Sequence, residues 1–523
     1  EYYFKRSGLY GFYDDGERFA FFSRAILEML FYTDFEPDII NCNDWQTALT
    51  PVYLNLYYRH LDKFSRIKTV FTIHNIAYQG KYGLDILEDT CGIGARDAHV
   101  VEYDGCANFM KGAIECADKV TTVSPTYAQE ILDPWFSHGL DGLLRQKQYK
   151  LCGILNGIDV DVFNPATDPD IAKNYDAETF QEGKAVCKEA LQDEFGLHKD
   201  GSPVMAMVTR LVGHKGVDLV QAIAEGLLQQ GIELVILGSG EAQYENFFNE
   251  LCARNPGRVG VYIGFNAKLA QQIYAGADIF LMPSRSEPCG LAQMVACRYG
   301  TPPIIRETGG LKDTVQPYEA WRDAGTGFTF ANYSSADMLH VIREAVYLYK
   351  DYPDAFARLR DRAMAQDFSW NRSAGDYLRI YGAVTGLSWE KSAPEAPAAE
   401  AAAPTEEPVI EVPAEEAVVS AAEPVSETAA KPAAKKAARK TAVKKPAAKK
   451  TTTRKTAAKA TTKKAAEKAV EKPTEKAAEK PVEEPAEEPV KKTAAKTMAP
   501  ADTVETTQPV QPKKKGAAKK AAK

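Results

Sequence analysis

The sequence of 523 residues lacks several features that would mark a specialised class of protein. Its nine cysteines are scattered, none forms a CxxC pair, and no Cys/His cluster has the spacing of a zinc site. An odd number of irregularly spaced cysteines argues against a disulfide framework and favours a reducing, cytoplasmic compartment. No uncharged apolar run reaches about 18 residues, which argues against a membrane span, and no signal peptide is visible.

Aromatic residues and cysteines are absent from positions 391–523. All 25 Tyr, 22 Phe and 5 Trp therefore lie in the first 390 positions. The last part of the chain consists mainly of Ala, Lys, Glu, Pro and Thr, and no window holds enough apolar surface to offset about 1–2 kcal/mol per residue of backbone ordering. We therefore predict a disordered tail over 391–523.

Charge is distributed as unevenly as the aromatic residues. Positions 391–523 carry 28 Lys and Arg against 19 Asp and Glu, which leaves 36 basic and 52 acidic residues for 1–390. An acidic body excludes bulk attraction to nucleic acid as its main activity. Within the tail, 431–523 holds 27 basic and 10 acidic residues, a composition typical of a segment that contacts nucleic acid or another polyanion. A solvated spacer without a ligand is the alternative.

Strand and helix patterns alternate through the first 390 residues. Strand candidates lie at 204–209, 233–237, 259–264, 278–282, 303–306 and 327–330, with helical windows at 217–230, 241–254, 267–276, 290–299 and 310–315. Strict alternation predicts right-handed βαβ units and a parallel sheet with helices on both faces. Upstream, strand candidates at 37–41, 68–74 and 119–124 accompany helical windows at 17–33, 45–58 and 108–117, and closing helices follow at 335–350, 353–366 and 373–384.

These patterns predict an α/β protein with two doubly wound, Rossmann-like domains and a cleft between them. We expect an amino-terminal domain over 1–165, a second domain over 166–375, a closing helix over 376–390 and the tail over 391–523. In open α/β sheets, ligands bind beyond the carboxyl ends of the strands, so the residues that follow the strands are the candidate site.

Two strand exits carry charged side chains. Arg210 and Lys215 follow one strand and suit an anionic group such as a diphosphate. The planar guanidinium of Arg can bind two phosphate oxygens at once, and the ammonium of Lys is a mobile point charge. A solvated basic turn is the alternative. Glu287 follows another strand and could accept sugar hydroxyls, face a developing positive charge, or simply cap a helix.

Three other segments are less specific. Thr308, Gly309 and Gly310 place backbone N–H groups at a helix start, which is either an anion site or a plain glycine turn. His74 ends a strand, and a single histidine there is more often structural than catalytic. Asn156-Gly157 is either a polar site turn or an ordinary type I′ turn. The sequence has no complete GxGxxG after a strand, no Walker motif and no GxSxG elbow.

Taken in order, the segments 71–80, 156–159, 210–216, 286–291 and 308–315 resemble those of bacterial glycogen synthases and plant starch synthases, over about residues 1–388. The resemblance implies a GT-B fold, with 1–165 on the acceptor side and 166–375 binding the nucleotide sugar. It also implies retaining transfer of glucose from ADP-glucose to the non-reducing end of an α-1,4-glucan such as glycogen, with no metal or other cofactor.

The same resemblance implies roles for individual residues. Arg210 and Lys215 match the pair that binds the donor diphosphate, Glu287 matches the carboxylate beside the donor sugar, and His74 matches a histidine near the reacting sugar. The other matched positions are implied to contact substrate: Asn75, Asn156, Phe265, Cys289, Gly290, Leu291, Thr308, Gly309 and Gly310. Phe265 stands where the family usually has a Tyr stacked on adenine, and His214 replaces a Gln.

The family pattern begins with a Lys-x-Gly-Gly-Leu loop, and no such loop occurs before Glu17. The chain therefore enters the pattern inside the amino-terminal domain. Two alternatives remain. One is a related GT-B transferase with another acceptor or a uridine donor, which is disfavoured because Val295 stands where the broader group carries a second Glu. The other is an inactive fragment whose basic tail, 431–523, binds a polyanion.

Overall fold

The computed structural model describes residues 5–6 and 8–387, and all of them belong to one compact unit. The tail for which disorder and a polyanion contact are predicted, 391–523, lies outside the described residues. Within them, no helix combines the length and the apolar character needed to cross a bilayer.

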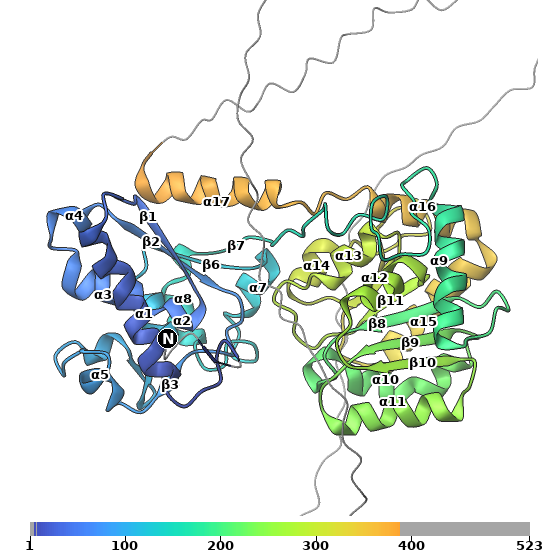
Figure 1. Ribbon diagram of the computed structural model, residues 1–523, viewed down its shortest axis with the longest axis horizontal. Coiled ribbons are helices and arrows are strands. Elements are labelled where there is room, and N and C mark those ends of the chain that lie inside the picture. The colour runs from blue at the N-terminus through green and yellow to red at the C-terminus, as the bar shows by residue number, and fades with distance from the viewer. Residues whose placement is uncertain (1–4, 7, 388–523) are drawn as a thin grey trace, which may run out of the picture. The chain divides into compact units, whose positions relative to one another are not determined.

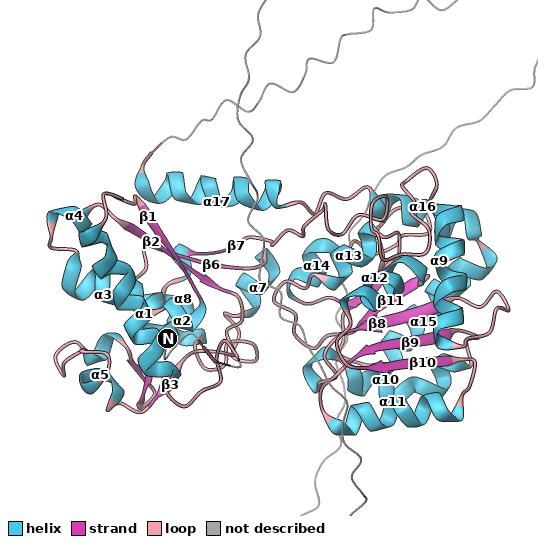
Figure 2. Ribbon diagram, in the orientation of Figure 1, coloured by secondary structure: helices cyan, strands magenta, loops and turns pink. Residues whose placement is uncertain are grey.

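The amino-terminal part is built on a four-stranded parallel sheet (Figures 1 and 2). Its order is β1-β2-β6-β7, with β1 Ile39–Asn43, β2 Lys68–Ile73, β6 Lys119–Thr122 and β7 Leu151–Gly153. Strand β2 is central and almost entirely buried, as its β-branched and aromatic residues lead one to expect. The predicted strands at 37–41, 68–74 and 119–124 are confirmed, whereas the three-residue β7 is too short to leave a recognisable pattern.

The helices of this part are α1 Asp15–Met29, which is the longest, and the shorter α2 Asp44–Thr47, α3 Leu49–Tyr53, α4 Asp62–Ser65, α5 Ile86–Asp89, α6 Phe109–Cys116, α7 Pro125–Glu130 and α8 Asp141–Gln146. A small antiparallel sheet, β3-β5-β4, is formed by β3 Lys81–Tyr82, β4 Glu102–Tyr103 and β5 Cys106–Asn108. The window predicted as one helix over 45–58 is divided into α2, α3 and a π-helical turn at Leu54–Tyr58.

The second sheet has six parallel strands in the order β10-β9-β8-β11-β12-β13. Their bounds are β8 Val204–Val208, β9 Glu233–Gly238, β10 Val259–Ile263, β11 Ile279–Met282, β12 Pro303–Arg306 and β13 Phe328–Phe330. Numbered along the chain this order is 3-2-1-4-5-6, the doubly wound Rossmann order, and its direction reverses between β8 and β11. The prediction of two Rossmann-like sheets in an α/β protein is confirmed, and the reversal marks where a ligand should bind.

Helices cover both faces of the second sheet (Figure 2). They are α9 Phe180–Phe195, α10 Val217–Leu228, α11 Ala242–Arg254, α12 Ala267–Gly276, α13 Ala292–Arg298, α14 Gly309–Thr314, α15 Ser335–Asp351 and α16 Pro353–Met364. Of these, the sequence patterns predict all but α9. That helix buries Gly183, Lys184 and Gln192 together with its apolar residues, so its inward face does not read as an apolar stripe.

Helix α9 is joined to the second sheet by buried charges. Lys188 of α9 and Arg360 of α16 both contact the carboxylate of Asp278, at 2.7 Å and 2.6 Å. Asp278 also accepts a hydrogen bond from the backbone N–H of Val204, the first residue of β8. Burial by itself would raise the pKa of Asp278, but the two cations outweigh it and lower the pKa below its usual value.

The chain crosses between the two sheets twice. On the way back, Ser369 pairs in parallel with Ile158, and the Ile158 N–H donates to the Phe368 carbonyl at 2.8 Å. Helix α17 (Trp370–Thr385, orange in Figure 1) then runs along the amino-terminal sheet, where the Ser373 hydroxyl donates to the Leu155 carbonyl at 2.6 Å. We call the two paired segments, 155–159 and 367–370, the strap.

Candidate active site

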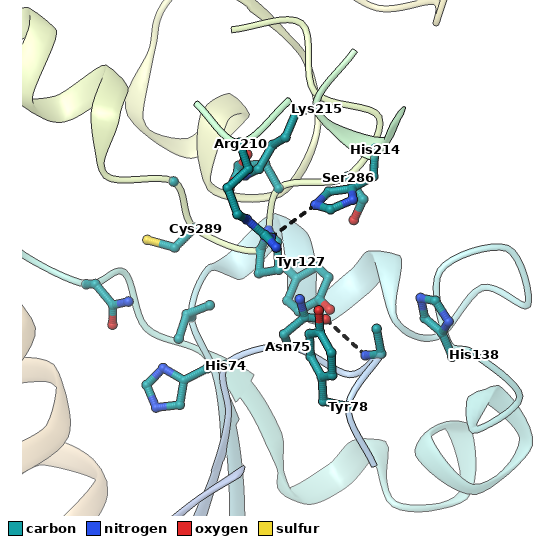
Figure 3. A pocket seen from close by; sticks show the side chains of 16 residues that line it. His74, Asn75, Tyr78, Tyr127, His138, Arg210, His214, Lys215, Ser286 and Cys289 are labelled. Carbon is teal, nitrogen blue, oxygen red and sulfur yellow. Dashed lines mark hydrogen bonds and ion pairs between the residues drawn. The ribbon is translucent and has the colours of Figure 1, made fainter. Parts of the chain in front are cut away.

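A cavity of about 380 Å³ is lined by loops from both sheets (Figure 3). His74 and Asn75 follow β2, Asn156 follows β7, Arg210 and Lys215 follow β8, and the loop from Ser286 to Gly290 follows β11. The cavity brings together eight residues singled out from the sequence: His74, Asn75, Asn156, Arg210, Lys215, Glu287, Cys289 and Gly290. Arg210, Lys215 and Glu287 lie at the topological switch point between β8 and β11, where the sheet order directs a ligand.

A short ion pair joins the two strand exits. The Lys215 ammonium lies 2.6 Å from Glu287 Oε2, which also accepts a hydrogen bond from the Ser284 hydroxyl at 2.9 Å. Gly216, at φ 75°, allows this approach, because a Cβ there would lie 2.1 Å from the Pro283 carbonyl oxygen. Glu287 is thus held by side chains and caps no helix, since α13 begins only at Ala292.

Arg210 is exposed and turned toward the same space (Figure 3). Its Nη2 lies 3.4 Å from His214 Nε2, and no carboxylate of the described chain pairs with it. Burial, followed by the charges of Lys215 and Arg210, lowers the pKa of His214 below its usual value. His214 is therefore neutral near pH 7, and the cationic charge of this loop resides on Arg210 and Lys215.

Cys289 is buried beside Asn156. Burial raises the pKa of its thiol to about 11, so the thiol is protonated at neutral pH and cannot act as a nucleophile.

Gly157 has no positive φ, which excludes the type I′ turn that Asn-Gly often forms. A Cβ at Gly157 would instead lie within 2.8 Å of the backbone of Ser369 and Trp370, so glycine is required for the close approach of the strap.

The N–H groups at the start of α14 are not bare. The Gly309 N–H donates to Glu130 Oε1 at 3.0 Å, the Thr308 hydroxyl to the same oxygen at 2.8 Å, and the Gly310 N–H to the Glu287 carbonyl at 3.1 Å. Burial raises the pKa of Glu130 above its usual value. Gly310 is needed for packing, because a Cβ there would lie 2.1 Å from the Cys289 carbonyl oxygen. A phosphate could use the Gly309 N–H only after the Glu130 carboxylate leaves it.

Helix α7 makes the reciprocal contact. The N–H and hydroxyl of Thr126, in its first turn, donate to the two carboxylate oxygens of Asp313 at 2.8 Å and 2.6 Å. Each of these short helices therefore receives at its amino end a carboxylate from the far end of the other, which favours both helix dipoles.

His74 is fixed by residues that follow β1. Its backbone N–H donates to Asp44 Oδ1 at 2.8 Å, and its Nε2 lies 3.0 Å from Asn43 Oδ1. Asp44 has a φ of 55°, and burial raises the pKa of its carboxyl group. Asp44 was not singled out from the sequence, because no local pattern shows that it lies under His74, 30 residues away.

Five predicted site residues do not line the cavity. Phe265 is 90% exposed beyond β10, Leu291 is half exposed, and Thr308, Gly309 and Gly310 lie behind the Glu287–Cys289 loop. Their contact with substrate stays a prediction. The cavity also contains Tyr78, Tyr127 and His138, which the sequence analysis missed. Tyr127 accepts a hydrogen bond from the Ile76 N–H, and nothing in its local sequence signals this role.

Within residues 5–6 and 8–387, no three or more His, Cys, Asp and Glu side chains are grouped so that they could hold a metal ion. The ionisable and amide side chains that line the cavity are instead two cations, one carboxylate, three histidines and two amides: Arg210, Lys215, Glu287, His74, His138, His214, Asn75 and Asn156. Such a set suits a ligand that combines negative charge with hydroxyl groups.

Comparison with known proteins places this geometry in a family. Residues 1–146 match the family model of the starch synthase catalytic domain, and residues 189–358 match that of the glycosyl transferases group 1. The chain is 50% identical to glycogen synthase from Geobacillus thermodenitrificans over 384 residues, which are 73% of this chain and 79% of that protein. It is 49% identical to glycogen synthase from Clostridium acetobutylicum over 388 residues, 73% and 81% of the two chains.

A solved structure agrees with these sequences. The catalytic domain of starch synthase IV from Arabidopsis thaliana, bound to ADP and acarbose, superposes with a TM-score of 0.68 at 36% identity, over 74% of this chain and 80% of that chain. Two Rossmann-like sheets with a charged cavity between their strand exits define a glycosyltransferase of the GT-B class. More specifically, the chain belongs to the family of glycogen and starch synthases.

Proposed function

We propose that the protein is a glycogen synthase that transfers glucose from ADP-glucose to the non-reducing end of an α-1,4-glucan, with retention of configuration. The observation that carries this proposal is the meeting of Arg210, Lys215 and Glu287 in one cavity at the switch point of the second sheet. The 50% identity to glycogen synthases supports the reaction, and the ADP and acarbose bound by the plant homologue support the two substrates.

The charges of the cavity match the charges that the reaction develops. When the bond from glucose to ADP breaks, negative charge grows on the diphosphate and positive charge on the sugar ring. Arg210 and Lys215 stabilise the first charge, and Glu287 stabilises the second. In the free enzyme the Lys215 ammonium and the Glu287 carboxylate form an ion pair at 2.6 Å. When the donor binds, its diphosphate replaces Glu287 as the anionic partner of Lys215.

The acceptor side of the cavity is formed by the loops after β2 and β7. His74, held by Asn43 and by the backbone bond to Asp44, lines the cavity, and we infer that it contacts the reacting sugar. Retention follows when the acceptor hydroxyl attacks the face from which ADP departs and gives its proton to the departing phosphate.

The direct test is incorporation of labelled glucose into glycogen by the protein expressed from its complete reading frame. We expect incorporation from ADP-glucose, at a kcat/KM well above that from UDP-glucose, and an α-1,4 linkage in the product by NMR. Preference for UDP-glucose would support the related transferase instead. An absence of transfer from both donors, in a preparation that binds ADP, would contradict the proposed function.

His214 provides a prediction about pH. Its pKa is lowered by burial and by Lys215 and Arg210, and a diphosphate beside these cations would favour the protonated imidazole. ADP binding should therefore take up a fraction of a proton near pH 7, so that affinity for ADP gains as the pH falls. Isothermal titration in buffers of different ionisation heats measures this uptake. The His214→Gln variant controls for protonation of ADP itself, and equal uptake in both proteins would contradict the prediction.

We further propose that the enzyme acts in the cytoplasm. All nine cysteines are free thiols in the structure, as expected for a protein of a reducing compartment.

A further inference from the structure

A second cavity, of about 830 Å³, lies away from the candidate active site. Its walls are the loop between α14 and β13, the carboxyl-terminal end of α15 and the first turns of α16. In that loop Glu319 pairs with Ala324 in an antiparallel bridge, which places Trp321 at the tip of a tight hairpin. We call this cavity the aromatic groove.

The aromatic groove exposes more ring surface than a folded protein normally leaves in water. Trp321 is 82% exposed, Tyr347 55% and Tyr352 51%, while Phe328 and Leu348 form a buried floor. The rings of Tyr347 and Tyr352 lie 5.4 Å apart at 70°, and their hydroxyls are 3.3 Å apart. Clustered exposed rings of this kind mark a surface that binds a partner. Rings with hydroxyl or N–H groups suit a ligand that has both apolar and polar sides.

The charges at the rim are already paired with one another. Glu319 lies 2.6 Å from Arg322, and Asp323 contacts Arg358 at 2.5 Å and Arg362 at 3.2 Å. A charged partner would gain little from groups that are already neutralised. A neutral ligand with many hydroxyl groups can instead use the same carboxylates and guanidinium groups as fixed hydrogen-bond acceptors and donors.

The aromatic groove and the active site lie at opposite ends of the strands of the second sheet. Phe328 begins β13 and pairs in register with Ile304 near the start of β12, whereas Arg306, at the end of β12, leads to the loop of Thr308. The aromatic groove therefore lies at the amino-terminal ends of the strands, whereas the active site lies at their carboxyl-terminal ends. A sugar bound in the groove is for this reason not the sugar that reacts.

We propose that the aromatic groove is a second binding site for the α-glucan polymer, which holds one arm of the acceptor while another chain end occupies the active site. This inference rests on the proposed function, because that function supplies a neutral, polyhydroxylated, many-armed ligand. A second contact raises the effective concentration of chain ends at the active site without altering the chemistry.

The test compares Trp321→Ala and Trp321→Phe with Tyr149→Ala, which removes an aromatic ring that is 79% exposed outside the groove. With ADP-glucose as donor, we expect Trp321→Ala to raise the KM for glycogen about 3- to 10-fold, the loss of one stacked ring. The kcat, the KM for ADP-glucose and the kcat/KM for maltotriose, which is a single short chain without a second arm, should not change. Trp321→Phe should restore most of the affinity, and Tyr149→Ala should behave as the wild type.

Retardation of each protein in a glycogen-containing native gel measures binding without catalysis. An unchanged KM for glycogen together with unchanged retardation in Trp321→Ala would overturn the proposed site, even if the wild type is an active synthase. If sedimentation shows that Trp321→Ala changes the association of the chain with itself and not its affinity for glycogen, the groove is a self-association surface and the proposal fails. A wild type that transfers no glucose to maltotriose would count against the proposed function, and its retardation would still report on the groove.

Discussion

Replacing Glu287 with glutamine is expected to lower the kcat for glucose transfer by about 100- to 1000-fold, the typical cost of losing one group that stabilises transition-state charge. The variant keeps the size of the side chain and can still accept from the Ser284 hydroxyl, but it removes the negative charge beside the sugar. Because Lys215 then has no anionic partner, affinity for ADP should hold or increase. The measurement is steady-state transfer from ADP-glucose, with ADP affinity determined separately.

Glu307 offers a matched control. It also follows a strand of the second sheet and pairs with a lysine, Lys312, at 3.6 Å, but it does not line the cavity. Glu307→Gln should therefore keep kcat within about twofold of the wild type. Equal losses in the two variants would mean that Glu287 serves only the fold, and an unchanged kcat in Glu287→Gln would remove it from the reaction altogether.

The second large effect is expected on stability. Asp278→Asn leaves Lys188 and Arg360 buried against a neutral amide, and breaking a buried ion pair in this way costs about 3–5 kcal/mol of the free energy of unfolding. Urea denaturation should show a correspondingly lower midpoint. The control is Asp193→Asn, which removes a surface pair with Lys199 at 2.7 Å and should cost less than about 1 kcal/mol.

The same carboxylate predicts a dependence on acid. Because the folded pKa of Asp278 is lowered, its contribution is complete above the unfolded pKa of about 3.9 and is lost as the pH falls through the folded value. The stability difference between the wild type and Asp278→Asn should therefore be constant from about pH 5 to 8 and shrink below about pH 4. A difference that grows on acidification would show that this ion pair does not stabilise the fold.

The sequence was sufficient to predict the second sheet because each of its strands is a short apolar run between helices of ordinary periodicity. It was not sufficient for α9, whose inward face includes Lys184. The ammonium of that lysine donates to the carbonyls of Ala275 and Tyr299 and to the hydroxyl of Thr301. These hydrogen bonds offset the cost of burying a charged side chain, and the local sequence does not show them. Burial lowers the pKa of Lys184 well below its usual value.

The candidate site was predictable to the extent that it consists of strand exits. Parallel strands bring their carboxyl ends to one edge, so Arg210 and Glu287 could be expected to meet although 77 positions separate them. The occupation of the Gly309 N–H by Glu130 could not be expected, because it joins elements 179 residues apart that no rule of sheet topology connects. The exposure of Phe265 could not be expected either, because it depends on the position of the loop after β10.

The strap limits how the cavity can open. Its two segments pair in parallel at Ile158 and Ser369. They lie so close together at Gly157 that even a methyl group there would collide, so one segment cannot move without the other. A methyl group at position 157 is therefore expected to force the two segments apart and to displace Asn156, which lies in the strap and lines the cavity.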